Sequence, residues 1–301
     1  MPALTQAQAA TRRLERTLRR TIRRFDLLAP GDRVLVAVSG GKDSLTLLDL
    51  LETWQRGTPS VELIAVHLDQ VQPGYDGRAL VEFLQTRTTP FEILREDTYS
   101  VVVDKLGEGE RKCSLCSRLR RGILYTAAER LGCNKLALGH HRDDSLETFL
   151  LNAFRAGRLQ ALPPKYPTDD GRFEVIRPLV ECAESDIVLH AEARGFPILP
   201  CNVCGSEPDS ERDRMARLLT ELERDNPNLR SILLHALGNV RPTHLFDLDL
   251  TRAWAARPSE IRPAAAHEPR QRHARALPVW SENFPARPSP ESGKTPATEA
   301  P

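Results

Sequence analysis

The spacing of hydrophobic residues changes along the chain. Near the N-terminus, Leu14, Leu18, Ile22 and Phe25 recur at helical spacing, which predicts a helix over residues 6–27. Further on, short apolar runs without alternating polar residues are typical of strands buried in a parallel sheet. These runs predict strands at 33–39, 63–68, 91–94, 135–139 and 175–179, and the segments between them predict helices at 44–54, 77–87, 117–131 and 144–155.

The alternation of strands and helices indicates a fold class. It is typical of repeated βαβ units, in which right-handed crossovers place helices on both faces of a parallel sheet. We therefore predict an α/β fold with a doubly wound parallel sheet, followed by C-terminal helices at 210–224 and 228–236.

The end of the chain has a different composition. Its final 47 residues hold 9 of the 23 prolines and show no apolar periodicity, which predicts a disordered tail. The predicted organisation is a basic helix over 1–29, an α/β domain over 30–200, C-terminal helices over 201–250 and a Pro-rich tail over 251–301.

Overall composition excludes two classes of protein. Of the 301 residues, 40% are hydrophobic and 28% are charged, which are ordinary values for a globular protein and exclude a fully disordered one. No apolar stretch approaches the roughly 18 residues that a membrane span needs. Since the N-terminal segment also lacks the apolar core of a signal peptide, we expect a cytoplasmic protein that binds no membrane.

Positive charge is concentrated locally although the formal net charge is only +1. The predicted N-terminal helix carries seven arginines against Glu15 and Asp26. Such an imbalance is typical either of a solvated helix face or of contact with RNA phosphates. A second basic cluster follows Cys116, where two arginines three positions apart share one side of a helix, although surface ion pairs would explain them equally well. The candidate RNA contacts are Arg19, Arg20, Arg118 and Arg121.

The segment between the first predicted strand and its helix suits a phosphate group. Its two glycines let the backbone approach a ligand closely, and free N–H groups of the turn and of the helix start can bind an anion. Asp43 fits there only if a divalent cation lies between its carboxylate and the phosphates. An ordinary strand-to-helix turn is the alternative. The candidate phosphate-binding residues are Ser39, Gly40, Gly41, Lys42, Asp43 and Ser44.

A second polar motif, LGHHRDD, follows the strand predicted at 135–139. Because the carboxyl ends of parallel strands meet at one edge of a sheet, this motif is expected to face the same crevice as the phosphate loop. Gly139 is a candidate nucleotide-binding residue. A helix N-cap would explain Asp144, so we predict the magnesium or catalytic role for Asp143.

Four of the six cysteines form two Cys-x-x-Cys pairs, at 113/116 and 201/204. Such pairs indicate structural zinc or an iron–sulfur cluster. Four thiolates would close a cluster, whereas three would leave one iron open for chemistry. We predict that the remaining two, Cys133 and Cys182, are small buried hydrophobic residues.

The motifs together resemble a known family. SGGKDS resembles the pyrophosphate-binding loop of the PP-loop ATPases, which split ATP between its α and β phosphates and adenylate a carbonyl oxygen. In order along the chain, the motifs are SGGKDS, CSLCSRLRRG, LGHHRDD, PPK, IRPL and PCNVCGS. This ordered set resembles the tRNA 2-thiocytidine synthetases over roughly residues 10–250.

The resemblance implies an activity and its cofactors. The expected reaction is ATP-dependent 2-thiolation of cytidine 32 in tRNA, with Mg²⁺, a [4Fe-4S] cluster in a cysteine-bearing insert, and Asp43 and Asp143 as catalytic residues. The resemblance assigns the cluster to Cys113, Cys116 and Cys204, although the residues alone do not decide between Cys201 and Cys204. It also implies that the protein binds the tRNA anticodon loop, takes sulfur from a cysteine-desulfurase-type donor and forms a homodimer.

Two other functions remain open from the sequence. One is a zinc-containing PP-loop enzyme for tRNA uridine thiolation or lysidine-type ligation. The other is a non-catalytic, zinc-stabilised RNA-binding protein. The intact SGGKDS loop argues against the latter, because binding RNA does not require it.

Overall fold

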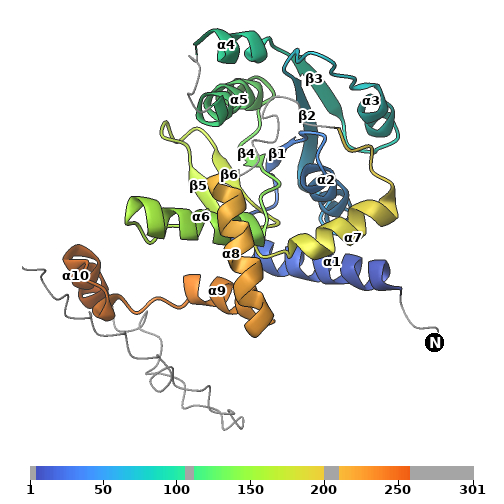
Figure 1. The fold of residues 1–301 in the computed structure, drawn as a ribbon. Coiled ribbons are helices and arrows are strands. Elements are labelled where there is room, and N and C mark those ends of the chain that lie inside the picture. The colour runs from blue at the N-terminus through green and yellow to red at the C-terminus, as the bar shows by residue number, and fades with distance from the viewer. Residues whose placement is uncertain (1–4, 106–111, 200–209, 258–301) are drawn as a thin grey trace, which may run out of the picture. The chain divides into compact units, whose positions relative to one another are not determined.

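The computed structural model describes residues 5–105, 112–199 and 210–257 (Figure 1). Six strands form one sheet in the order β3-β2-β1-β4-β6-β5. All neighbouring strands are parallel except β5 and β6, which are antiparallel. The strands are β1 (Arg33–Ala37), β2 (Glu62–Asp69), β3 (Phe91–Arg95), β4 (Lys135–Ala137), β5 (Lys165–Pro167) and β6 (Glu174–Ile176).

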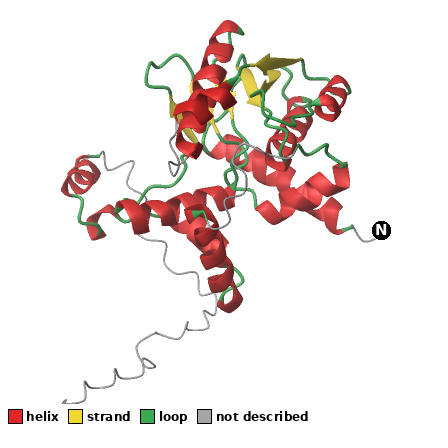
Figure 2. Ribbon diagram, turned by 45° about the horizontal axis from the view of Figure 1, so that its top comes forward, coloured by secondary structure: helices red, strands yellow, loops and turns green. Residues whose placement is uncertain are grey.

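Helices cover both faces of this sheet (Figure 2), which confirms the predicted doubly wound α/β fold. On one face, α1 (Gln6–Arg24), α2 (Lys42–Gln55) and α7 (Glu184–Arg194) pack against side chains such as Val34 and Val36. On the other face, α5 (Lys112–Arg130) packs against Leu35 and Leu136. Successive residues of β1 thus belong to opposite cores, which is why its apolar run is continuous.

The C-terminal helices pack on α6 (Arg142–Leu151) rather than on the sheet. Leu146 and Leu150 of α6 form a small core with Met215 and Leu219 of α8 (Glu211–Asp225), and residues of α9 (Leu229–Leu237) pack around it. A short π-helical turn, Asn152–Ala156, continues α6. Both helices that were predicted in this region are therefore confirmed.

A buried polar network holds α2 between α1 and α7. His190 is fully buried, and its Nε2 lies 3.1 Å from Asp49 Oδ2 while its Nδ1 lies 2.9 Å from Thr11 Oγ1. Burial raises the pKa of Asp49, but hydrogen bonds from His190 and Arg87 outweigh it and lower the pKa to about 2. The carboxylate therefore stays charged, and it anchors the helix that follows the phosphate loop.

Some elements were not predicted. They are the helices α4 (Thr98–Lys105), α7 and α10 (Leu248–Ala256) and the edge strand β5. The helix α3 (Arg78–Gln85) was predicted. Each of the elements that were not predicted is only 3 to 11 residues long. Segments this short contain few periods of the hydrophobic pattern, and β5 even contains Pro167, which the edge of a sheet tolerates.

Two boundaries differ from the sequence-based prediction. Residues 251–256, which we assigned to the Pro-rich tail, belong to α10, because the Asp247 side chain caps its first turn by accepting the Leu250 N–H. Residues 258–301 of the predicted tail lie outside the described residues. The predicted cysteine-bearing insert is not confirmed either, since Cys116 belongs to α5, whose later residues pack on the sheet.

The chain divides after Val240 into two compact units. The second contains the 3-10 turn Pro242–His244 and α10, which are joined by the hydrogen bond from Thr251 Oγ1 to the Pro242 carbonyl. Across the described ranges, no helix combines the length and the apolar character needed to cross a membrane.

Candidate active site

A cavity of about 310 Å³ lies at the carboxyl edge of the sheet, where β1 and β4 are neighbours. The strand order reverses at this pair, and such a switch point is where open α/β sheets bind ligands. The structure brings the two predicted motifs together here, along with residues of α5 and α8. The polar residues and the glycine that line the cavity are Ser39, Asp43, Ser44, Arg120, Gly139, His140, Asp144 and Arg212.

The phosphate loop is held in shape by its own hydroxyl groups. The Ser39 N–H donates to Ser44 Oγ at 3.1 Å, and the Gly41 N–H donates to Ser39 Oγ at 3.3 Å. Gly40 has a φ of +84°, a left-handed conformation that favours glycine. Since Gly41 provides no side-chain cap for α2, the first N–H groups of that helix remain available for an anion.

The phosphate loop also contacts the segment that precedes the second cysteine pair. The Leu199 N–H donates to the Gly40 carbonyl at 2.9 Å. A Cβ on Gly40 would lie 2.7 Å from the Leu199 side chain, so the two segments are closely packed. Leu199 is the last described residue before Cys201. Its contacts with Gly40 therefore join the phosphate loop to the segment that leads to the second cysteine pair.

Gly139 allows the end of β4 to approach the start of α2. A Cβ at this position would lie 3.1 Å from the Asp43 carbonyl carbon and 3.1 Å from the Ser44 nitrogen. These are backbone atoms, which cannot turn away as a side chain can. A larger residue at position 139 would therefore displace the phosphate loop.

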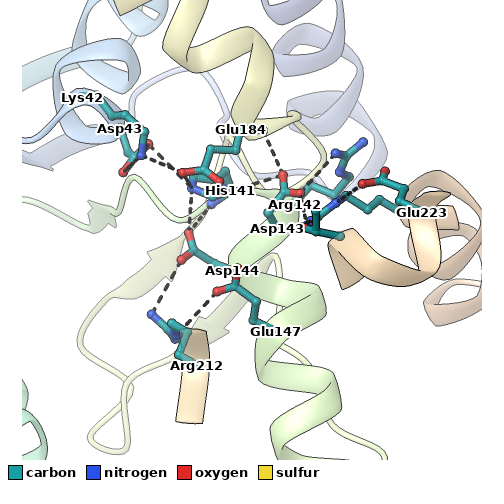
Figure 3. A network of polar contacts seen from close by, with 12 residues as sticks. Lys42, Asp43, His141, Arg142, Asp143, Asp144, Glu147, Glu184, Arg212 and Glu223 are labelled. Carbon is teal, nitrogen blue, oxygen red and sulfur yellow. Dashed lines mark hydrogen bonds and ion pairs between the residues drawn. The ribbon is translucent and has the colours of Figure 1, made fainter. Parts of the chain in front are cut away.

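The carboxylates of Asp43, Asp143, Asp144 and Glu184 lie within 4.0 Å of the His141 imidazole beside the cavity (Figure 3). His141 Nε2 lies 3.6 Å from Asp43 Oδ1 and 3.4 Å from Asp144 Oδ2. Asp43 Oδ1 is buried and has no hydrogen-bond partner among the described residues, but it forms an ion pair with Lys42 Nζ at 3.1 Å. Lys42 Nζ contacts Asp43 and lies 2.9 Å from Glu184. Burial lowers the pKa of Lys42, but these two acidic neighbours outweigh it and raise the pKa above its ordinary value.

The two adjacent aspartates face different surroundings. Asp143 is 3% exposed, accepts the Glu184 N–H at 2.8 Å and pairs with Arg230 at 2.8 Å and Arg142 at 3.2 Å. Burial raises its pKa, but the charge of Arg142 and the Glu184 N–H outweigh this and lower the pKa.

Asp144, by contrast, lines the cavity, and it accepts the His141 N–H at 2.9 Å at the start of α6. The capping function expected of Asp144 is therefore present, although the N-cap itself is His141. Since the carboxylate of Asp143 is already satisfied by protein groups, the structure favours Asp144 as the acid that faces a ligand.

Three further cavity residues were not among the predicted site residues. Arg120 lies four positions from both Cys116 and Leu124, so all three residues share one face of α5. This spacing could have identified Arg120 from the sequence. Burial and the charge of Arg177 lower the pKa of His140 to about 4, so its imidazole is neutral at pH 7. Arg212 reaches the cavity from α8, and no local pattern points to it.

The predicted RNA contacts lie elsewhere. Arg118 and Arg121 are exposed on α5 and do not line the cavity. Arg19 and Arg20 lie on the outer face of α1, and Arg20 Nε is 3.4 Å from Glu181. With their neighbours they line a shallow groove formed by Arg12, Glu15, Arg16, Arg19, Arg20 and Arg23.

The structure describes the surroundings of some of the cysteines. Cys116 is buried, and its Sγ donates to Gln70 Oε1 at 3.3 Å. The Cys113 side chain, Cys201 and Cys204 lie outside the described part of the chain. Cys133 and Cys182 are 6% and 1% exposed, which confirms that they are buried. Among the described side chains, no group of three or more His, Cys, Asp or Glu residues could hold a metal ion.

The sheet order and the SGGKDS loop at its switch point define a PP-loop nucleotide-binding protein. A family model described as the PP-loop domain matches residues 10–197. Over 253 residues the chain is 50% identical to the tRNA-cytidine(32) 2-sulfurtransferase of Anaeromyxobacter dehalogenans (strain 2CP-C), covering 84% of this chain and 87% of the relative. The protein of that name from Cytophaga hutchinsonii is 47% identical over 250 residues, covering 83% and 88%. The chain belongs to the family of tRNA-cytidine(32) 2-sulfurtransferases, as the ordered motifs predicted.

A solved structure supports the fold. The U34-tRNA thiolase NcsA from Methanococcus maripaludis, solved with its [4Fe-4S] cluster, is 25% identical and has a TM-score of 0.62. The match covers 78% of this chain and 81% of that one.

Proposed function

We propose that this protein uses ATP to replace the C2 oxygen of cytidine 32 in tRNA with sulfur. One observation carries the proposal. The phosphate loop and the helix that begins with the first cysteine pair line the same cavity, through Ser39 and Ser44 on one side and Arg120 on the other. A nucleotide and a sulfur-carrying group would therefore meet at one site. The name shared by relatives at 47–50% identity supports cytidine as the target.

The first step activates a poor leaving group. The C2 oxygen of the base attacks the α-phosphorus of ATP, the bond between the α and β phosphates breaks, and pyrophosphate leaves. The N–H groups of the phosphate loop and the start of α2 hold the departing pyrophosphate. Lys42 and Arg120 supply positive charge where negative charge develops.

The residues beside the loop fit a magnesium ion. Among the described residues, the buried Oδ1 of Asp43 has no hydrogen-bond partner and pairs with Lys42 Nζ at 3.1 Å, and Asp43 and Asp144 both lie beside His141 Nε2. Mg²⁺ is commonly held by one or two carboxylates together with substrate phosphates. We propose that Asp43 and Asp144 hold it, and that it neutralises charge on the phosphates. Asp143 then acts as a positioning residue that fixes the start of α6 against Arg230.

The second step transfers sulfur. A hydrosulfide attacks C2 and loses its proton, and AMP leaves with the former base oxygen. We propose Cys113, Cys116 and Cys204 as ligands of a [4Fe-4S] cluster, which would supply an open iron site for the sulfur. Of these, Cys116 lies on the face of α5 that also carries Arg120, and the [4Fe-4S] cluster of the related U34 thiolase supports the assignment.

The remaining partners follow from the reaction and the family. An anticodon loop exposes its bases at a cost of no more than a few kcal/mol, so we propose that the loop places cytidine 32 in the cavity. We further propose a cysteine-desulfurase-type sulfur donor, a homodimer and a cytoplasmic location. Thiolation of uridine is less well supported, because the uridine enzyme is only 25% identical to this chain.

The proposed activity is tested by deleting the gene and analysing the nucleosides of total tRNA. We expect 2-thiocytidine to disappear and to return when the wild-type gene is restored. 2-Thiouridine should be unchanged, which serves as the internal control. Persistence of 2-thiocytidine in the deletion strain would contradict the proposal.

The arginine groove on α1 gives a prediction about RNA binding. Replacing Arg19 and Arg20 with alanine should weaken tRNA binding and leave ATP affinity unchanged, because both side chains are exposed and lie on α1, whereas the cavity is lined by other elements. Each lost phosphate contact should reduce the slope of log K against log salt by about 0.7–0.9.

The matched control for this variant is Arg130→Ala with Arg172→Ala. These arginines are 52% and 53% exposed, pair with Glu92 and Glu129, and lie neither on α1 nor in the lining of the cavity. If the α1 variant and the control have the same salt slope as the wild type, the arginine face of α1 is merely solvated.

A further inference from the structure

Arg212 enters the cavity from the first turn of α8, shortly after the second cysteine pair. Its guanidinium lies beside two carboxylates of α6, with Nη1 3.7 Å from Asp144 and Nε 3.7 Å from Glu147. Nη2 donates to Thr148 Oγ1 at 3.5 Å. Figure 3 shows Arg212 on the opposite side of Asp144 from Lys42 and Asp43.

These contacts are too long to satisfy the guanidinium. Charge-assisted N–H···O bonds are ordinarily about 2.7–2.9 Å long. Arg230 illustrates the difference, because it holds Asp143 and Glu223 at 2.8 Å each and its side chain is only 13% exposed. The Arg212 side chain is 48% exposed and lines the cavity. The guanidinium is therefore loosely held and accessible to a ligand in the cavity.

The position of Arg212 indicates which phosphate group of the nucleotide it would contact. The phosphate loop supplies the groups for pyrophosphate, and it lies on the side of Lys42 and Asp43. Arg212 lies on the other side of Asp144, and in ATP the α-phosphate is the anionic group that adjoins the pyrophosphate. A guanidinium binds a phosphate through two parallel hydrogen bonds.

We propose that Arg212 binds the α-phosphate of ATP and of the adenylated base. This inference rests on the proposed ATP site. The α-phosphate is the one phosphate that remains after pyrophosphate leaves, so Arg212 would hold the AMP unit until sulfur displaces it. Because α8 follows Cys204, the same contact links the nucleotide to the helix beyond the second cysteine pair.

The test compares two probes by calorimetry with Mg²⁺ and without tRNA: AMP, which carries only the α-phosphate, and inorganic pyrophosphate. Arg212→Ala should weaken AMP binding about 10- to 100-fold, the range expected for a hydrogen bond between charged groups. Its affinity for pyrophosphate should stay within about twofold of the wild type. Arg212→Lys should weaken AMP binding less, since it keeps the charge but loses the paired geometry.

Arg214→Ala is the matched control. Arg214 lies on the same helix, bonds Glu211 at 3.0 Å and does not line the cavity. It should bind both probes as the wild type does, and the melting temperatures of all variants should establish that they fold. Should Arg212→Ala fail to fold, Arg212→Lys decides the question by the same comparison.

Three outcomes would overturn the inference. Unchanged AMP affinity in Arg212→Ala would make the residue a surface ion pair of Asp144 and Glu147. Equal loss of AMP and pyrophosphate binding would make its role structural. Unchanged AMP affinity together with weaker tRNA binding, measured by a separate titration of the same variants with tRNA, would assign the guanidinium to an RNA phosphate. Failure of the wild type to bind pyrophosphate would instead contradict the proposed ATP site. The proposed thiolation activity is tested separately, by measuring 2-thiocytidine in the deletion strain.

Discussion

Replacing Asp43 with alanine or asparagine should abolish thiolation while the protein keeps its fold and its iron. Asp43 belongs to the phosphate loop, where a carboxylate is favourable only with a cation between it and the phosphates. Its buried Oδ1 has no hydrogen-bond partner among the described residues and pairs with Lys42 Nζ at 3.1 Å. Removing the charge should lower the rate with Mg²⁺ by at least about 100-fold, the usual effect of losing one group that stabilises the transition state. The measurement is the single-turnover rate of 2-thiocytidine formation, with melting temperature and iron content measured alongside.

Substitutions at three other aspartates test whether the effect is specific to Asp43. Asp144→Asn should reduce the rate in the same way, because Asp144 also lines the cavity. Asp143→Asn should mainly lower the melting temperature, since it leaves Arg230 and Arg142 without their buried partner. Asp186→Asn is the control, because it removes a carboxylate of α7 that pairs with Arg13 away from the cavity. Its thiolation rate should be normal. A near wild-type rate for Asp43→Ala would show that Asp43 is only a turn residue.

The second large effect concerns the cysteines. Cys113→Ala, Cys116→Ala and Cys204→Ala should each lose iron and activity, because two thiolates do not hold a cubane cluster well. Cys201→Ala should keep most of its iron, since the fourth iron has to stay open for sulfur. The measurement is iron per chain after anaerobic reconstitution. Cys133→Ala and Cys182→Ala are the matched controls, because these residues lie in hydrophobic cores, where the change should cost about 1 kcal/mol of stability.

The comparison of Cys201 with Cys204 separates three possibilities. If the Cys201 variant loses iron and the Cys204 variant keeps it, the third ligand is misassigned but the mechanism stands. If both variants lose iron, four thiolates close the cluster. The proposed mechanism of sulfur transfer through an open iron site would then be wrong. A persulfide on one of these cysteines would have to carry the sulfur instead.

Local sequence was sufficient to predict the strands that form the centre of the sheet. Residues of β1 are apolar on both sides because both faces of the strand are covered, and such a run is visible without any tertiary information. The phosphate loop was predictable for a similar reason. Its chemistry depends on consecutive residues. In the structure, Ser39 and Ser44, the first and last residues of this six-residue loop, are hydrogen-bonded to each other.

The choice between Asp143 and Asp144 could not be made from the sequence. The two residues are neighbours in the first turn of one helix, so their side chains leave the helix in different directions. Which direction faces the cavity depends on where Arg230 and the Glu184 N–H lie, and they come from α9 and α7. Both partners are more than 40 residues away along the chain.

The sequence by itself determined the family, the α/β class and the two motifs that line the cavity, because each of these depends on short-range pattern. Only the tertiary structure decided which residues complete the site. Arg120 and Arg212 are 92 positions apart and belong to helices on different parts of the fold, yet they line one cavity with Asp144. Helix packing sets that arrangement, since residues distant in sequence come together only when the apolar faces of α5 and α8 are buried against the sheet and α6.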